Sequence, residues 1–150
     1  MSDIYEMIAN HMHENIAFSR ESGITIQSIG KGVSEVKLPF QDKIKNHVET
    51  AHAGAIFTLG ETASGAAMSG LLGEALFTLR PVAAEASIKY LKTGKSDLTA
   101  YGKADLPLDE IMAKIESDGK TTFNVGVEIK DADENLVCEM TVLWHLKKTG

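Results

Sequence analysis

The sequence predicts a single α+β domain with an antiparallel sheet, and three observations support this prediction. The 150 residues fit one domain, and 43% apolar with 24% charged residues is typical of a folded globular chain. One long apolar stretch, residues 53–72, is typical of a buried helix. The remaining apolar residues alternate in short runs separated by turn sequences. Such turns connect antiparallel strands, because parallel pairs need longer crossovers.

The first element expected along the chain is a helix over residues 3–20. Ser2 or Asp3 can cap its start, with Glu6 three positions after Asp3. Gly23 marks the expected end of the helical segment. Apolar residues recur near the helical period at Ile4, Met7, Ile8, Met12 and Ile16.

Two short strands are expected next, the first at residues 24–27 and the second over residues 36–40. The sequence Gly30-Lys31-Gly32 between them indicates a hairpin connection. Residues 41–51 are polar and show no period, so we expect a loop that leads into the long helix.

Four further strands are expected after Pro81, in two pairs. Turn sequences at residues 92–95 and 131–135 separate the members of each pair. A short helix is expected between the pairs, after Pro107 and with Asp109 near its start. The expected strands cover residues 82–91, 97–105, 121–130 and 136–146.

Charge and cysteine content exclude several classes of function. Fifteen basic against 21 acidic residues give a net charge of −6, which disfavours nucleic acid or an anionic membrane as a partner. The single Cys138 excludes an internal disulfide and fits a reducing compartment. No apolar run of 18 residues opens the chain, so we expect a cytoplasmic protein.

The long helix has two faces of different character. Its several glycines lower helix propensity but allow the backbone to approach a sheet closely. One stripe of small and apolar residues should face the sheet: Ile56, Leu59, Gly60, Ala63, Ala67 and Gly70. A second stripe is turned by roughly 100° and should lie against another subunit or a pocket: Phe57, Glu61, Ser64, Met68 and Leu72.

Glu61 is the lone ionisable residue of this helix. A carboxylate among apolar neighbours loses hydration, which raises its pKa and makes it a better proton acceptor near neutrality. The alternative is that Glu61 reaches water at a subunit rim or pairs with a lysine.

Polar groups that could bind a carbonyl stand just before and at the start of the helix. The first backbone amides, at Ala53 and Gly54, have no intrahelical partner and carry the positive end of the helix dipole. Asn46 offers an amide side chain in the preceding loop. The alternative is that Asn46 bonds its own backbone and His52 only braces the helix start.

Together these residues resemble the hotdog-fold acyl-CoA thioesterases, particularly the phenylacetic-acid-degradation type. Asn46, His52-Ala53-Gly54 and Glu61 match the family's amide, His-Gly-Gly and acidic positions. Ala53 departs from the first glycine, and Glu61 stands where Asp is commoner. The resemblance implies the hotdog fold, an antiparallel sheet of five to six strands wrapped around a long central helix.

The resemblance also implies hydrolysis of an acyl thioester, with a coenzyme A thioester as substrate and neither a cofactor nor a metal. The Ala53 amide, with that of Gly54, would polarise the carbonyl. Glu61 of the facing subunit would activate water or attack directly, and Asn46 would orient water or the carbonyl. His52 is the histidine of the motif. The uncovered helix stripe and sheet edges predict a homodimer, or a dimer of dimers.

Contacts to the substrate are expected from three kinds of side chain. Apolar residues near Glu61 suit an acyl group, and two hydroxyls lie nearest the position, here Gly65, where many relatives carry one. Two lysines in the turn after residues 82–91 could meet the diphosphate, unless they are simply a solvated turn. These residues are Phe57, Thr62, Ser64, Met68, Lys92 and Lys95.

Two other functions stay open on the hotdog scaffold. One is a dehydratase of 3-hydroxyacyl thioesters that uses His47, which precedes Glu61 by 14 positions, although that family's proline-containing turn is missing. The other is a non-catalytic acyl-CoA binding protein. Zinc and cysteine chemistry are disfavoured, since His11 and His13 point apart on a helix and Cys138 lies on an apolar strand face.

Overall fold

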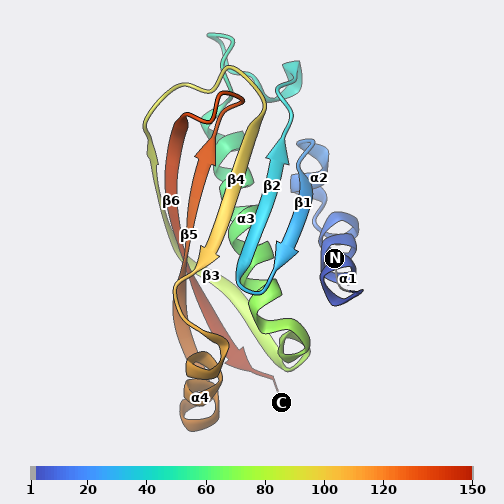
Figure 1. Cartoon of the computed structure of the whole chain (residues 1–150), viewed down its shortest axis with the longest axis vertical. Helices are drawn as coiled ribbons and strands as arrows, with labels where there is room; N and C mark the ends of the chain where they lie inside the picture. The colour runs from blue at the N-terminus through green and yellow to red at the C-terminus, as the bar shows by residue number, and fades with distance from the viewer. Residues whose placement is uncertain (1–2, 150) are drawn as a thin grey trace.

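The structure is a computed structural model that describes residues 3–149. Six strands form one sheet in the order β1-β2-β4-β5-β6-β3, all neighbours antiparallel, and the sheet curves around helix α3 (Figure 1). The predicted α+β class, antiparallel sheet and central helix are confirmed. The elements are α1 (Asp3–Asn15), α2 (Ala17–Glu21), β1 (Thr25–Gly30), β2 (Val33–Leu38), η1 (Asp42–Ile44), α3 (Ala53–Leu72), η2 (Gly73–Thr78), β3 (Leu79–Tyr90), β4 (Leu98–Ala104), α4 (Leu108–Asp118), β5 (Lys120–Lys130) and β6 (Leu136–Lys148).

The N-terminal segment is two helices rather than the one predicted. Ile16 leaves helical geometry, with φ −103° and ψ 83°, and separates α1 from α2. The guanidinium of Arg20 compensates for the break, because it donates hydrogen bonds to the carbonyls of His13 (3.0 Å) and Glu14 (2.8 Å). The expected cap at Ser2 lies outside the described residues, and Gly23 ends the segment at a φ of +89°.

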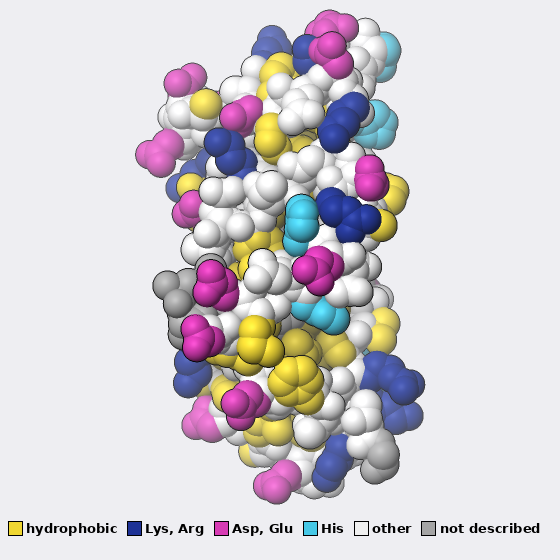
Figure 2. Space-filling model, turned by 90° about the vertical axis from the view of Figure 1, so that its right-hand side faces the viewer, with side chains coloured by type: hydrophobic (Ala, Val, Ile, Leu, Met, Phe, Trp, Pro, Cys, Tyr) yellow, Lys and Arg dark blue, Asp and Glu magenta, His cyan; other side chains and the backbone are white. Residues whose placement is uncertain are grey.

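The face that carries α1 and α2 is shown in Figure 2, where hydrophobic side chains gather in the lower half. Met7 of α1 and Phe77 of η2 are among the exposed apolar residues, at 57% and 73%. They line a cavity of about 350 Å³ between α1 and η2, together with Ile4 and Leu76. This apolar region lies away from the start of α3.

Two of the three expected hairpins are present, and the prediction of the third was wrong. The β1–β2 connection is a tight turn with Gly32 at a φ of +76°, and β5 pairs with β6 as expected. The strands around residues 92–95 do not pair with each other, because β3 pairs with β6 at the sheet edge while β4 lies between β2 and β5. Residues 91–97 instead cross the end of the sheet. Alternation determines which side chains share a face, but it does not select the partner strand.

The small stripe of α3 faces the sheet, as predicted. A Cβ at Gly60 would overlap Met140 of β6, and one at Gly70 would overlap the Gly30 carbonyl of β1. We expected the whole second stripe to lie against another subunit or a pocket, but only part of it is left uncovered by the chain's own sheet. Ser64, Met68 and Leu72 are buried within the chain, because the sheet curves far enough for Trp144 of β6 to donate a hydrogen bond to Ser64 Oγ (3.2 Å).

The close approach at Gly70 predicts a large difference between two alanine substitutions in α3. We expect Gly70→Ala to destabilise the fold by about 1–3 kcal/mol or more, because the new methyl group meets backbone that cannot rotate away. Gly65→Ala is the matched control. Its Cβ would lie 3.5 Å from the Trp144 ring, an ordinary contact, so improved helix propensity should leave stability unchanged or raise it by up to about 1 kcal/mol. Urea denaturation at one protein concentration measures both, and equal effects would contradict the packing account.

Candidate functional site

Glu61 lies half-buried on the face of α3 that the sheet leaves uncovered. Burial raises the pKa of its carboxyl above the ordinary value of 4.5. Within residues 3–149 the carboxylate makes no hydrogen bond and no ion pair, so the lysine partner considered above is not found in a single chain. Glu61 is therefore a desolvated carboxylate that is free to accept a proton.

Asn46 organises the turn that precedes α3. Its Oδ1 accepts hydrogen bonds from the amides of Val48 (3.1 Å) and Thr50 (3.0 Å), and its Nδ2 donates to Thr50 Oγ1 (2.8 Å). The structure thus matches the alternative in which a loop asparagine bonds its own backbone. One Nδ2 hydrogen is not used by these bonds, and the role of Asn46 in orienting water stays a prediction that depends on it.

His52 caps the start of α3, since its Nδ1 accepts a hydrogen bond from the Gly54 amide (2.8 Å). This contact fits the bracing alternative for His52 and places the proton of the neutral ring on Nε2. It also corrects the expectation for Gly54, because its amide is engaged and cannot bind a carbonyl in this arrangement. The amides of Ala53 and Ala55 donate no hydrogen bond within the described part of the chain, so the helix start keeps donors for a ligand.

A cavity of about 400 Å³ lies beside these donors, between α2, the segment 43–45 and the start of α3. Ala55 and Thr58 line it from α3, and Phe18 of α2, which is 73% exposed, lines the opposite side. Thr58 precedes Glu61 by three positions, so both side chains project from one face of the helix. Glu61 is not among the residues that line the cavity, but it lies one helical turn beyond Thr58, which is.

Three residues near this site were missed by sequence reasoning. Tyr90, at the end of β3, donates a hydrogen bond from its hydroxyl to the Ala53 carbonyl (3.2 Å). Thr58 could have been found from its helical spacing to Glu61. Tyr90 and Phe18 could not, because their positions depend on the path of β3 and on the break between α1 and α2.

Lys92 and Lys95 lie on the exposed loop that follows β3. The Gly94 carbonyl in this loop accepts a hydrogen bond from the Ala51 amide (2.8 Å), which holds the loop beside the segment that precedes α3. The two lysines are thus brought to the same end of the molecule as the Ala53 amide. Their contact with a phosphate stays a prediction.

The remaining expected substrate contacts separate into two groups. Phe57 is half-buried beside Glu61 and belongs to the candidate site. Thr62, Ser64 and Met68 are buried in the chain's own core, and the two hydroxyls donate to the carbonyls of Thr58 (2.7 Å) and Glu61 (2.7 Å). We leave these three side chains out of the candidate site.

A thiolate nucleophile has little support in this structure. Burial raises the pKa of the Cys138 thiol to about 11, which disfavours a thiolate nucleophile. Among residues 3–149, no group of three or more His, Cys, Asp or Glu side chains is arranged to hold a metal ion. Within the same residues, no helix has both the length and the apolar character needed to cross a membrane.

Comparison with known proteins supports this fold. A family model described as a domain of unknown function, DUF4442, matches residues 6–146, whereas no curated protein matches. Among solved structures, the Pseudomonas aeruginosa protein PA5026, described as of unknown function and a probable thioesterase, has a TM-score of 0.85 at 23% identity and covers 96% of both chains. The PaaI protein of the Escherichia coli phenylacetic acid degradation operon has a TM-score of 0.76 at 24% sequence identity. The match covers 99% of this chain and 96% of that protein. A hypothetical thioesterase of Streptococcus pneumoniae has a TM-score of 0.66 at 26% sequence identity. The match covers 84% of this chain and 91% of that protein. These similarities establish the hotdog fold.

Proposed function

Because the chain belongs to the DUF4442 family and has the hotdog fold, we propose that it hydrolyses acyl-coenzyme A thioesters to a free acid and a thiol. The observation that carries this proposal is the half-buried Glu61 carboxylate on the exposed face of α3; within residues 3–149 it has no partner, and the first amide of the helix donates no hydrogen bond. The description of PA5026 as a probable thioesterase supports the same reaction class.

Hydrolysis follows from these groups without a further cofactor. The Ala53 amide donates a hydrogen bond to the thioester carbonyl, and the positive end of the α3 dipole favours the negative charge that develops on this oxygen. The Glu61 carboxylate takes a proton from water while the water oxygen attacks the carbonyl carbon. The carbon–sulfur bond then breaks, the thiolate leaves and is protonated, and the free acid remains.

The two groups must come from different copies of the chain. Glu61 follows Ala53 by eight residues, which is about 12 Å along the helix axis at 1.5 Å per residue. A carbonyl bonded to the Ala53 amide cannot also meet a water activated by Glu61 of the same chain across that distance. We therefore propose a homodimer in which Glu61 of one copy faces Ala53 of the other.

The β3 edge supplies the surface for this pairing. β3 has 12 residues and, among the described strands, pairs with β6 alone. It is exposed over most of its length, including Ala83, Ala86 and Tyr90 on the face that is turned toward the helix side of the sheet. Long unpaired edges with small apolar residues readily pair with another strand. A second copy on this edge would extend the sheet and bring a second α3 opposite the first.

An assay of free-thiol release from a panel of acyl-CoAs tests the proposal, with aliphatic and aromatic acyl groups and the Glu61→Ala variant for comparison. We expect release above the control for at least one substrate. Tight binding of acyl-CoA without thiol release over hours would instead favour the binding-protein alternative. Hydration of crotonyl-CoA that survives Asn46→Ala but not His47→Ala would favour the dehydratase.

A further inference from the structure

The cavity of about 350 Å³ between α1 and η2 also reaches the last turns of α3, and it opens on the face shown in Figure 2. Its volume falls within the range of about 300–1,000 Å³ that is common for small-molecule sites. Segments that are distant in sequence form its hydrophobic walls, with Ile4, Met7, Ile8 and Met12 from α1 and Leu76 and Phe77 from η2.

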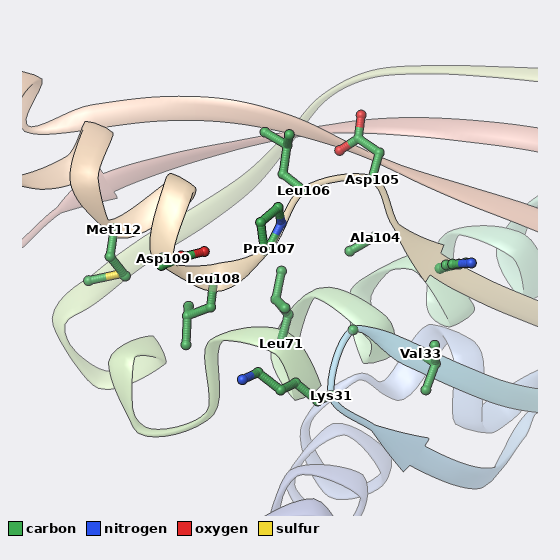
Figure 3. A pocket seen from close by; sticks show the side chains of 12 residues that line it. Lys31, Val33, Leu71, Ala104, Asp105, Leu106, Pro107, Leu108, Asp109 and Met112 are labelled. Carbon is green, nitrogen blue, oxygen red and sulfur yellow. The ribbon is translucent and has the colours of Figure 1, made fainter.

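Charge distinguishes this cavity from the larger groove of about 820 Å³ between the β1–β2 turn and the start of α4 (Figure 3). Both signs of charge line that groove, from Lys31, Lys103, Asp105 and Asp109. Among residues 3–149, no aspartate, glutamate, lysine or arginine lines the cavity between α1 and η2, and its one titratable lining residue, His11, is exposed to solvent. A charged ligand would lose hydration there without gaining a counter-ion. The cavity therefore suits a neutral ligand.

Ser69 provides a buried polar group in the lining, since the residue is only 6% exposed. It follows Gly65 by four positions, so the two residues share one face of α3. That face is turned toward α1, because a Cβ at Gly65 would lie 3.8 Å from Met12 Cε. The side chain of Ser69 thus projects from α3 toward α1 and the cavity.

The Ser69 hydroxyl lacks the hydrogen bond that other hydroxyls of α3 make. Thr58, Thr62 and Ser64 each donate to a backbone carbonyl three or four residues earlier, at 2.8, 2.7 and 2.7 Å. Within the described chain, Ser69 Oγ has one acceptor, Met68 Sδ, at 4.0 Å. A thioether sulfur is a weak acceptor, so the burial of this hydroxyl costs free energy that a ligand oxygen would recover.

From these observations we propose that the cavity binds a small neutral molecule with an apolar body and one hydroxyl or carbonyl oxygen. The apolar body lies between the walls from α1 and η2, and the oxygen accepts a hydrogen bond from Ser69 Oγ. Met7 and Phe77, which are 57% and 73% exposed, mark the entrance. A flat protein surface placed over these two side chains would leave the Ser69 hydroxyl without an acceptor. The site goes beyond the proposed hydrolysis and does not depend on it.

Titration of the ¹⁵N-labelled protein with 2-phenylethanol, followed through its amide resonances, tests the inference. We expect saturable shifts at residues 4–12 and 69–77, with a Kd of about 1 mM or tighter, which is within reach of a ligand of this size. Two charged analogues, 2-phenylethylammonium and 3-phenylpropanoate, should bind at least about tenfold more weakly, because the cavity offers no counter-ion.

A serine substitution tests the role of the hydroxyl. Ser69→Ala should weaken the binding of 2-phenylethanol about 3–10-fold, the loss expected for one neutral hydrogen bond. The same variant should bind propylbenzene, in which a methyl group replaces the ligand hydroxyl, as tightly as the parent does. Ser117→Ala, at an exposed serine of α4 outside the cavity, is the matched control and should leave both affinities unchanged.

Several results would overturn the inference. These are no saturable shifts beside the cavity, equal affinity for the charged analogues, or unchanged binding of 2-phenylethanol in Ser69→Ala. Shifts of the same amides on concentrating the protein without ligand would show that this surface pairs two copies instead. Glu61→Ala should bind 2-phenylethanol as the parent does, and loss of binding in that variant would place the ligand in the proposed active site. None of these results would by itself contradict thioester hydrolysis.

Discussion

Replacing Glu61 with Gln is expected to lower kcat for thioester hydrolysis by about 10³-fold, because a general base contributes roughly 10²–10⁴-fold to such reactions. The substitution keeps the size of the side chain but removes the group that accepts the proton from water. Glu74→Gln, at an exposed acid of η2, is the matched control and should leave kcat unchanged. Steady-state kinetics on the best acyl-CoA measures the effect, and equal rates in the parent and Glu61→Gln would remove Glu61 from the mechanism.

The raised pKa of Glu61 adds a pH dependence with a definite sign. The base must be ionised, so kcat/KM should rise with pH through a pKa above 4.5 and then level off, and Glu61→Gln should remove this limb of the profile. Stability should change in the opposite direction. Because folding favours the protonated carboxyl, stability is lost as pH rises above the pKa of the unfolded chain. Glu61→Gln should therefore match or exceed the parent in Tm at pH 7 and show no advantage well below pH 4.

The central helix could be predicted from sequence because its composition leaves few alternatives. A stretch of 20 residues with one ionisable group, four glycines and apolar residues at helical spacing does not fit a solvent-exposed helix or an edge strand. The prediction that the stripe of small residues faces the sheet was also correct. Gly60 and Gly70 approach side chains and backbone of the sheet too closely for any Cβ. Local pattern and tertiary packing agree here.

The candidate site was predicted less completely, because its details depend on how much of the helix the sheet covers. Ser64 and Met68 share a stripe with Glu61, but only the curvature that carries Trp144 to Ser64 decides that they are buried. The engagement of the Gly54 amide depends on the rotamer of His52. Neither property has a periodic signal in the sequence.

A charged substitution on the β3 edge is expected to be as damaging as loss of Glu61. Ala86 faces the helix side of the sheet and is exposed in one chain, so Ala86→Lys should leave the subunit folded while an inward-pointing lysine blocks strand pairing. We expect a monomer by analytical ultracentrifugation and a loss of hydrolysis of about 10³-fold, because each site needs Glu61 of the other copy. Thr141→Lys, at an exposed position of β6, is the control and should keep both the dimer and the activity. A fully active monomer would contradict the two-copy site.

Mixing two inactive variants tests the same arrangement directly. Ala53→Pro removes the proposed amide donor while proline suits the first position of a helix, and His52 already has the extended geometry (φ −66°, ψ 137°) that a following proline requires. Alone, this variant should lose about 10²–10³-fold in kcat. Refolded together with Glu61→Gln at equal amounts, half of the dimers should be mixed, and each mixed dimer carries one site with both intact groups. Activity should then recover to about a quarter of the parent's, as expected for a symmetric two-copy interface. No recovery from a mixture that forms mixed dimers would show that Ala53 and Glu61 act within one chain or not at all.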